Sequence, residues 1–491
     1  MRDIAELKKA YEPNGEPQSP IEWINYMSGE LGSQRSKMKP YRDAYDATDQ
    51  PINYAQEKFR EIFGDMFFGW RDNFCSLIVD SISERLIVQG FRMTQDQKEK
   101  ELYDKDAQEI WQRSYLDADS NAAHIDALVQ GSSFLINWVD DDGKQIIVPE
   151  SAHDVVVKYY PGSRRKVYRG YREFTDDWGA THATLWDPNY VYTAVRGAKE
   201  DSKWSHPTVD PNPYGVVPIT ALTNRKRLKP EPFSELAAIL PIQEAINKVS
   251  SDAIIASEFA AFPQRVIMGL EPFEDTDEER NAMLRAYVDR ILAFDGENVS
   301  IDQWQPADLG NYVKLIDMLV QHMASQSRVP FHYFLLNGGQ APSGESITAA
   351  EAGLVAKANE RMLHFGESWE MAMRIAFRGM GDPRADAFAA ECVWDNPERQ
   401  SIGVLIDSAV KKAANLDVPK QQIWEDIGYS QAQIARFPQM KEEELKQEKR
   451  WADKYTPEHE RKALDQPGQG QKAPAKNATA ERQKEKANRA A

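Results

Sequence analysis

The chain has 491 residues, of which 41% are apolar, so it can build several domains with packed cores. Its net charge of −17 excludes a protein that grips duplex DNA through a basic face, and its two cysteines exclude a disulfide framework. The start of the chain has no apolar leader, and no apolar run approaches the roughly eighteen residues of a membrane span.

The first predicted helix has a clear start. Ser19 stands at the N-cap position, Pro20 at the first helical position and Glu22 at the third, which is the pattern of a capping box. Apolar residues then recur at helical spacing at Ile24, Met27 and Leu31.

A second helix is predicted over residues 56–82. Its apolar stripe is rich in aromatic residues and consists of Phe59, Ile62, Phe63, Met66, Phe67, Trp70, Phe74, Leu77 and Ile78. Such a stripe could be interpreted as a cofactor-binding box. Helical spacing favours ordinary core packing instead.

A strand over 86–93 and a helix over 104–130 follow, with Gly131 as the C-terminal glycine of that helix. From 132 to 221 the pattern changes to short β-strands. The run from Asp140 to Gly143 lies between two of them. We interpret it as a hairpin turn rather than a calcium loop, because the other ligands of such a loop are missing.

Two long helices, at 233–261 and 307–329, flank a compact module at 262–305. Pro241 is expected to be a kink or a first-turn residue of the former helix. The module is expected to hold three short strands and a helix over 276–291. Two helices of matched length around a small insertion predict an antiparallel hairpin that carries a tip domain.

A polar loop at 337–345 precedes a helix predicted over 346–378. Ser343 is the candidate N-cap of this helix. Glycine weakens a helix interior by about 1 kcal/mol relative to alanine, so Gly353 and Gly366 predict a bend. Gly366 is favoured because aromatic residues stand on both sides of it.

The chain then returns to a strand over 389–395, followed by helices over 398–415 and 419–436. From 451 onward the sequence is polar. Residues 466–491 hold six basic and two acidic residues, and no aromatic or large aliphatic residue. This tail is expected to be disordered because it has nothing to bury.

The sequence shows no catalytic constellation, phosphate loop, dinucleotide fingerprint or zinc-ligand spacing, so no catalytic, cofactor-binding or metal residue is predicted. The residues around Ser343 mark a helix start rather than a nucleophile elbow. Histidines near the loop, such as His332 and His364, are interpreted as packed or surface residues. We therefore predict a protein that is not an enzyme and needs no cofactor.

Three segments resemble the portal proteins of long-tailed, siphophage-type bacteriophages, as found among phages of actinobacteria. They are YAQEKFREIFGDMFFGWRDNFCSLIVDSISERLIVQGFR at 54–92, FPQRVIMG at 262–269, and VPFHYFLLNGGQAPSGESITAAEAGLVAKANERMLHFGESW at 329–369. The resemblance covers roughly residues 20–450. It implies an α+β, mainly helical portal fold with a wing, a stem helix hairpin, a small α/β clip, a tunnel loop with a long kinked helix, and a helical crown.

Carried over by position, the parts are the wing (1–232 and 379–396), the stem helices (233–261 and 306–329), the clip (262–305), the tunnel loop and helix (330–378), the crown (397–450) and the polar tail (451–491).

The resemblance further implies a ring of about twelve subunits at the portal vertex of the capsid, assembled in the host cytoplasm. Double-stranded DNA would be packaged and ejected through its channel without sequence specificity. Expected partners are the major capsid protein, the scaffold protein, the large terminase subunit and a head-tail adaptor protein, with no membrane. The alternatives are another virion protein, such as a minor capsid or head-completion protein, or a hydrolase whose site is too dispersed to recognise.

Two sets of residues are expected at the channel. The tunnel loop set is Asn337, Gly338, Gly339, Gln340, Ser343, Gly344 and Glu345. The acidic clip and channel set is Glu271, Glu274, Asp275, Asp277, Glu278, Glu279, Asp295, Glu297 and Asp302. Residues 271–308 hold eleven acidic and three basic residues. Such a run is ordinarily a solvated face, but a ring would multiply the charge into a field that keeps DNA off the wall.

Overall fold

The computed structural model describes residues 16–48, 72–93, 103–199, 202–225, 228, 232–261, 265–270, 291–295, 300–303, 308–334, 344–398, 402–429 and 431–455. The chain divides into two compact units, Met1–Val404 and Leu405–Ala491. Over the described residues, the first unit combines helices with four separate sheets, and the second is helical.

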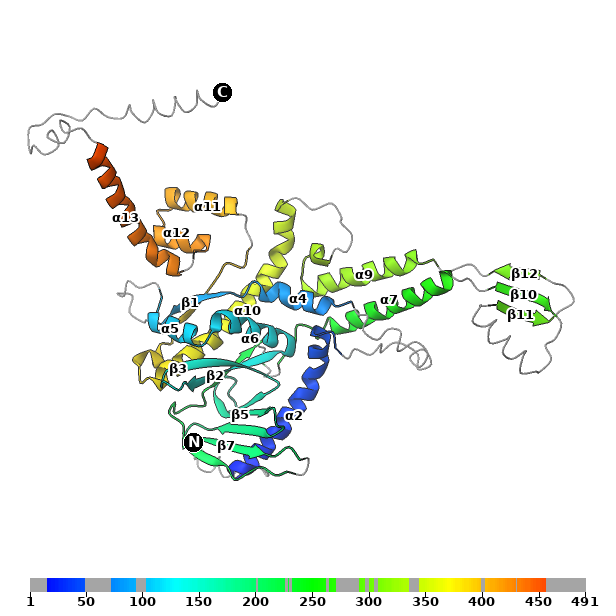
Figure 1. Ribbon diagram of the computed structural model, residues 1–491, viewed down its shortest axis with the longest axis horizontal. Helices are drawn as coiled ribbons and strands as arrows, with labels where there is room; N and C mark the ends of the chain where they lie inside the picture. Colours follow the sequence, from blue (N-terminus) through cyan, green and yellow to red (C-terminus); the bar gives the residue numbers. More distant parts are fainter. Residues whose placement is uncertain are drawn as a thin grey trace, which may run out of the picture. The chain divides into compact units, whose positions relative to one another are not determined.

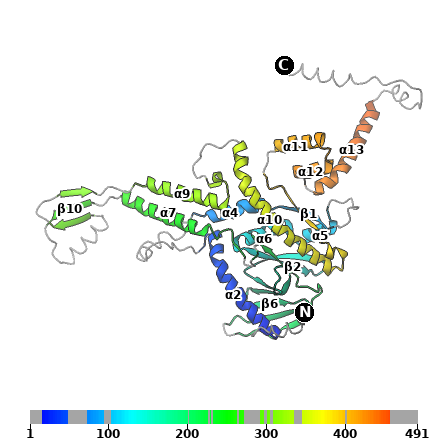
Figure 2. The same ribbon diagram turned by 180° about the vertical axis from the view of Figure 1, so that it is seen from behind.

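Helix α2 (Pro20–Tyr45) begins as the sequence predicts. The Ser19 side chain accepts a hydrogen bond from the backbone N–H of Glu22, and Pro20 occupies the first turn. The apolar face of α2 is buried against a five-stranded sheet, with Ile24, Met27 and Leu31 fully covered. Figures 1 and 2 show α2 running along this sheet.

That sheet has the strand order β4-β5-β6-β7-β8 and is antiparallel throughout. Its strands are β4 (Val155–Tyr159), β5 (Val167–Thr175), β6 (Thr181–Trp186), β7 (Tyr190–Arg196) and β8 (Thr208–Pro211). A second sheet, of order β3-β2-β9, consists of β2 (Ser132–Val139), β3 (Gln145–Ser151) and β9 (Ile219–Thr223).

The run from Asp140 to Gly143 is a hairpin turn between β2 and β3, as predicted. The backbone N–H of Asp140 donates to Lys144 and that of Gly143 donates back to Asp140. Oδ1 of Asp140 accepts the N–H groups of Asp142 and Lys144 within the turn, and its Oδ2 pairs with Arg113 at 3.3 Å. Gly143 has a φ of 76°, a conformation that favours glycine.

Two predicted helices in the N-terminal part of the chain differ from expectation. Residues 72 and 73 are not helical, and Asn73 caps a new helix, α4 (Phe74–Ser83), so a single helix over 56–82 is wrong. Residues 51–71, with most of the aromatic stripe, lie outside the described part of the chain. The helix predicted over 104–130 is two helices, α5 (Lys105–Arg113) and α6 (Leu116–Gln130). Tyr115 separates them with a φ of 54°, and Gly131 ends α6 as predicted.

The two long helices are α7 (Leu240–Ala261) and α9 (Gly310–Ser327). They pack against each other and run in opposite directions (Figures 1 and 2). Pro241 lies in the first turn of α7. Between them in sequence lies a three-stranded sheet of order β11-β10-β12, formed by β10 (Arg265–Leu270), β11 (Ile291–Asp295) and β12 (Ser300–Gln303). The helix predicted over 276–291 falls on residues outside the described part, apart from Ile291, which begins β11.

The 36-residue helix α10 (Gly344–Gly379) follows the short 3₁₀ turn η2 (Phe331–Phe334). A second 3₁₀ turn, η3 (Pro383–Asp386), leads to β13 (Glu391–Trp394). The predicted returning strand is therefore present. It pairs antiparallel with β1 (Val88–Arg92), bringing two segments about 300 residues apart in sequence side by side.

The second unit contains α12 (Lys420–Ile427) and α13 (Gln431–Tyr455), and α11 (Ile402–Asn415) leads into it. The single helix predicted over 419–436 is divided at Gly428, whose φ is 96°. Phe437 packs on both Trp424 and Tyr429 across this turn. Helix α13 runs on to Tyr455, so the first residues of the segment assigned to the polar tail are helical.

Candidate functional site

The predicted channel residues fall largely on undescribed segments. Asn337, Gly338, Gly339, Gln340 and Ser343 lie outside the described part of the chain, and so do Glu271, Glu274, Asp275, Asp277, Glu278, Glu279 and Glu297. The helix after the loop begins at Gly344, immediately after the candidate cap.

Four predicted residues have a described backbone position. Gly344 and Glu345 lie in the first turn of α10. Asp295 is the last residue of β11, and Asp302 lies within β12 opposite Val266 of β10. The loop and the clip residues therefore remain predictions as channel-lining groups.

Helix α10 presents one broad apolar face to the core of the first unit. From Leu354 onward this face is almost completely buried, and it consists of Leu354, Ala358, Met362, Phe365, Trp369, Ala372, Met373, Ala376 and Phe377. The helix packs against strands β2, β3 and β9 and against β13. By contrast, Ala349, Ala350 and Ala352 in its N-terminal turns are exposed. The C-terminal two thirds of α10 are thus packed in a core, whereas the alanines of its loop-proximal turns are exposed.

A buried ionic cluster holds the middle of α10. Glu235, just before α7, receives the Lys357 ammonium on Oε2 at 2.7 Å and the Arg361 Nε–H on Oε1 at 3.0 Å. Asn224 donates a further hydrogen bond to Oε1 at 3.0 Å. All three charged side chains are at most 8% exposed. This cluster joins α10 to the segment that leads into α7.

Charge attraction decides the protonation state of this cluster. Burial alone would raise the pKa of Glu235, but Lys357 and Arg361 outweigh it and lower that pKa to about 2. Burial lowers the pKa of Lys357, against the opposing pull of Glu235. Glu235 is therefore ionised at neutral pH, with two cations on its two oxygens.

A second buried cation holds the start of α10. Arg85 is only 1% exposed in its side chain and lies 3.3 Å from Glu351 of α10. It also donates to the hydroxyl of Tyr333 at 2.9 Å and to the carbonyl of Pro397 at 2.6 Å. Arg85 thereby ties three parts of the chain together: η2, α10 and the segment after β13.

Neither cluster was predicted from the sequence. The sequence did offer one indication, which is where the two cations stand in the helix. Lys357 and Arg361 are four residues apart and alternate with Leu354, Ala358 and Met362 on the buried face of α10. A long cation on an apolar face implies a buried anion, but the sequence does not show which acidic residue supplies it.

Aromatic packing completes the attachment of α10. Trp369 donates its indole N–H to Nε2 of His124 at 3.0 Å, and the His124 ring stacks on Phe365 with centroids 5.3 Å apart. Burial lowers the pKa of His124 to about 3, so this histidine is neutral. It is a packed core residue rather than a general base.

The two glycines of the predicted bend lie in different surroundings. At Gly366 an added Cβ would stand 3.2 Å from the indole nitrogen of Trp394 and 3.6 Å from Cβ of Cys392. At Gly353 the nearest atoms, both of Arg328, would be 3.8 Å away. Helix α10 is continuous through both positions. The close approach of β13 explains why residue 366 is a glycine without requiring a bend there. The bend therefore remains a prediction.

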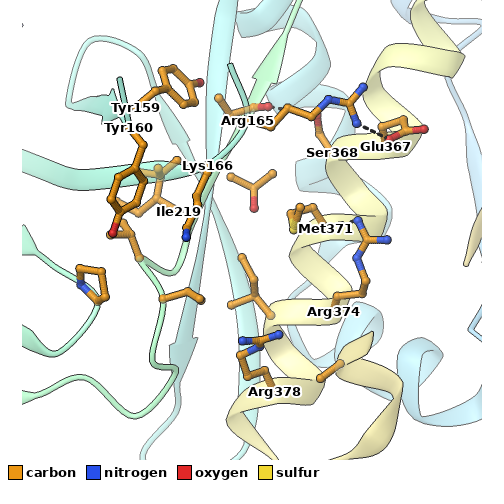
Figure 3. Close-up of a pocket in the computed structure, with 18 of the residues that line it drawn as sticks. Tyr159, Tyr160, Arg165, Lys166, Ile219, Glu367, Ser368, Met371, Arg374 and Arg378 are labelled. Atoms are coloured by element: carbon orange, nitrogen blue, oxygen red, sulfur yellow. Dashed lines mark hydrogen bonds and ion pairs between the residues drawn. The ribbon is translucent and has the colours of Figure 1, made fainter. Parts of the chain in front are cut away.

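Beside the C-terminal half of α10 there is a cavity of about 420 Å³. Figure 3 shows Arg165, Lys166 and Ile219 on one side and Met371 and Arg374 of α10 on the other. Among the described residues no group of three or more His, Cys, Asp or Glu side chains could hold a metal ion. No helix in that part of the chain combines the length and hydropathy needed to cross a bilayer.

Comparison with known proteins identifies the family. The family model described as "Phage portal protein, SPP1 Gp6-like" matches residues 72–449. The portal proteins of Mycobacterium phage D29 and Mycobacterium phage L5 are each 30% identical to this chain, over 391 and 393 residues. Both alignments cover 75% of this chain and 78% of the relative.

Among solved structures, a chain from the virion of a native gene transfer agent particle aligns with a TM-score of 0.40 and 10% identity, over 80% of this chain and 99% of that chain. That similarity is too distant to argue from. The family match and the two relatives suffice: this chain belongs to the SPP1 Gp6-like phage portal proteins.

Proposed function

We propose that about twelve copies of this portal protein form a ring at one capsid vertex, through which double-stranded DNA is packaged and later ejected. In this proposal α7 and α9 are the stem, the sheet of β10, β11 and β12 belongs to the clip, and residues 337–345 are the tunnel loop. The sheets with α2 and the β1–β13 pair form the wing, and α11, α12 and α13 form the crown.

The main support for the proposal is the way in which α10 is held in the first unit. Buried ionic clusters at Glu235 and Arg85 and the apolar core hold its body, while the turns next to the loop stay exposed. A loop on such a support can be kept in one place while a long polymer moves past it. Neutral loop residues such as Gln340 would make weak contacts with phosphates that break and re-form as DNA advances.

Exposed apolar side chains on α9 support self-association. Val313, Leu315 and Met318 are 53%, 40% and 45% exposed in the single chain. A ring would bury them against the neighbouring subunit. The acidic run at 271–308 would then act on DNA as a repeated negative surface that prevents adhesion.

The partners of the ring follow from its place in the virion. One face would bind the large terminase subunit during packaging and a head-tail adaptor afterwards, and the wing would contact the major capsid protein and scaffold. The portal family is a structural family, and we propose no enzymatic activity. The alternatives of a head-completion protein or a hydrolase gain no support from the family match.

The test is negative-stain imaging and light scattering of the purified protein, for which we expect a ring with an axial hole. Val313→Asp should reduce ring formation by placing a carboxylate in the subunit contact. Asn311→Asp is the matched control, because Asn311 is an exposed polar residue of the same helix. A protein that stays monomeric at all concentrations, or a Val313→Asp variant that assembles like Asn311→Asp, would contradict the proposed ring contact.

A further inference from the structure

The cavity beside α10 is positively charged in an acidic protein. Its lining includes Arg165, Lys166, Arg374 and Arg378 but only one carboxylate, that of Glu367. The chain as a whole has a net charge of −17. The residues that line the cavity therefore carry a net charge of about +3, opposite in sign to the net charge of the whole chain.

Arg374 is the central feature of this cavity. It is 8% exposed, and its guanidinium lies 3.5 Å from the carbonyl oxygen of Ala387 and 3.9 Å from the sulfur of Met371, with the Phe388 ring 5.3 Å away. Within the described residues, no carboxylate lies within ion-pair distance of it. Glu370, one turn earlier on α10, interacts with its charge without forming an ion pair. A buried cation without a paired anion is costly, so this position favours a ligand that brings one.

The other cations differ from Arg374 in exposure. Arg165 pairs with Glu367 at 2.7 Å, and Arg378 with Asp386 at 3.3 Å, but these pairs are largely exposed. Exposed pairs contribute little and exchange readily with other partners. Figure 3 shows Arg165 reaching from the strand side across to Glu367 on α10, at the edge of the cavity.

The remaining wall is apolar. Val217, Ile219, Met371 and Ile375 line it, together with Tyr159. A wall of this kind suits an aliphatic or aromatic side chain better than the sugar-phosphate backbone of DNA. A volume of about 420 Å³ holds a few side chains, not a folded element.

We propose that this cavity binds a short acidic peptide segment of another protein, anchored by one apolar side chain. The anchor packs on Ile219 and Met371, a carboxylate of the segment pairs with Arg374, and a second carboxylate approaches Lys166 at the edge. The apolar wall distinguishes this occupant from DNA, whose anionic sugar-phosphate backbone offers no apolar anchor, and the cross-linking experiment below separates it from a second copy of this chain. The proposal does not depend on DNA passage, because peptide binding needs neither a ring nor a capsid.

The first experiment measures the fluorescence anisotropy of a fluorescein-labelled probe, Gly-Asp-Glu-Phe-Asp-Glu-amide, with the purified full chain. We expect saturable binding that is at least about tenfold weaker for Arg374→Met and unchanged for Lys411→Met, an exposed cation that does not line the cavity. A probe with serine in place of phenylalanine, or with lysines in place of the acids, should bind at least as poorly as the variant.

A second variant covers the case in which Arg374→Met does not fold. Lys166 is exposed, so Lys166→Glu should leave folding intact while weakening the probe severalfold. Absence of saturable binding to the wild-type protein, or equal binding to wild type and Lys166→Glu, would overturn the proposal.

The occupant can be identified in assembled phage particles in which a photo-reactive benzoylphenylalanine replaces Val216 at the cavity wall. We expect a cross-link to a segment of another protein that carries clustered acidic residues beside an apolar one, and its loss with Lys166→Glu. A cross-link to a second copy of this chain, to DNA or to a basic segment, or no cross-link at all, would overturn it.

Discussion

Replacing Glu235 with glutamine tests how the long helix is held. Glutamine keeps the size of the side chain but removes the charge, leaving the cations of Lys357 and Arg361 buried without their anion. Breaking a buried pair on one side typically costs about 3–5 kcal/mol. Lowering the pKa of Glu235 from 4.5 to about 2 independently corresponds to roughly 3 kcal/mol of favourable coupling.

The assay is urea unfolding, followed by the fluorescence of tryptophans in the core around α10. We expect Glu235→Gln to lower the free energy of unfolding by about 3 kcal/mol. Glu367→Gln is the matched control, because Glu367 is an exposed carboxylate of α10 itself. Its partner Arg165 and Glu367 itself are more than half exposed, so a loss below about 0.5 kcal/mol is expected.

The same coupling predicts the acid behaviour of the wild-type protein. Because the pKa of Glu235 is lowered in the folded state, its stabilising contribution is complete above about pH 4.5 and is lost as pH falls toward 2. The difference in stability between wild type and Glu235→Gln should therefore shrink across that window. A difference below 0.5 kcal/mol at neutral pH, or one that does not change with acid, would refute the role given to this cluster.

Three other predictions concern helix α10, the tail and the loop. Gly353→Ala should stabilise the helix by about 0.5–1 kcal/mol and so raise the melting temperature. Gly366→Ala should give no such gain, because its Cβ would crowd Trp394. Equal gains for the two variants would contradict this packing. Deleting residues 466–491 should leave the melting temperature and ring size unchanged, since the segment has nothing to bury; a drop of several degrees would show that it is docked. Gln340→Lys should preserve folding and assembly but slow packaging or reduce the amount of DNA retained, because lysine adds a salt-dependent attraction to the phosphates. Packaging at the wild-type rate at every salt concentration would exclude the proposed contact.

Local chemistry made parts of the fold predictable from the sequence. The start of α2 depends on Ser19, Pro20 and Glu22, which are neighbours in the chain, and the hairpin at Asp140 depends on a turn of four residues. Each signal acts over less than one helical turn. Sequence reasoning therefore located these elements correctly.

Other features depend on contacts between distant residues. The break at Tyr115 interrupts a helical pattern that contains neither proline nor glycine at that point, so nothing local marks it. Glu235 lies more than 120 residues before the two cations that it binds. The cavity beside α10 is likewise assembled from separate segments, and no spacing in the sequence indicates it.

The pairing of β1 with β13 has a consequence for synthesis. Arg92 and Glu391 are 299 residues apart, so β1 leaves the ribosome long before its partner strand exists. At about 5–20 residues per second the wait lasts roughly 15–60 s. Throughout that time β1 is an unpaired edge that other nascent chains can join. Holdase chaperones should therefore have their largest effect on this chain in that interval.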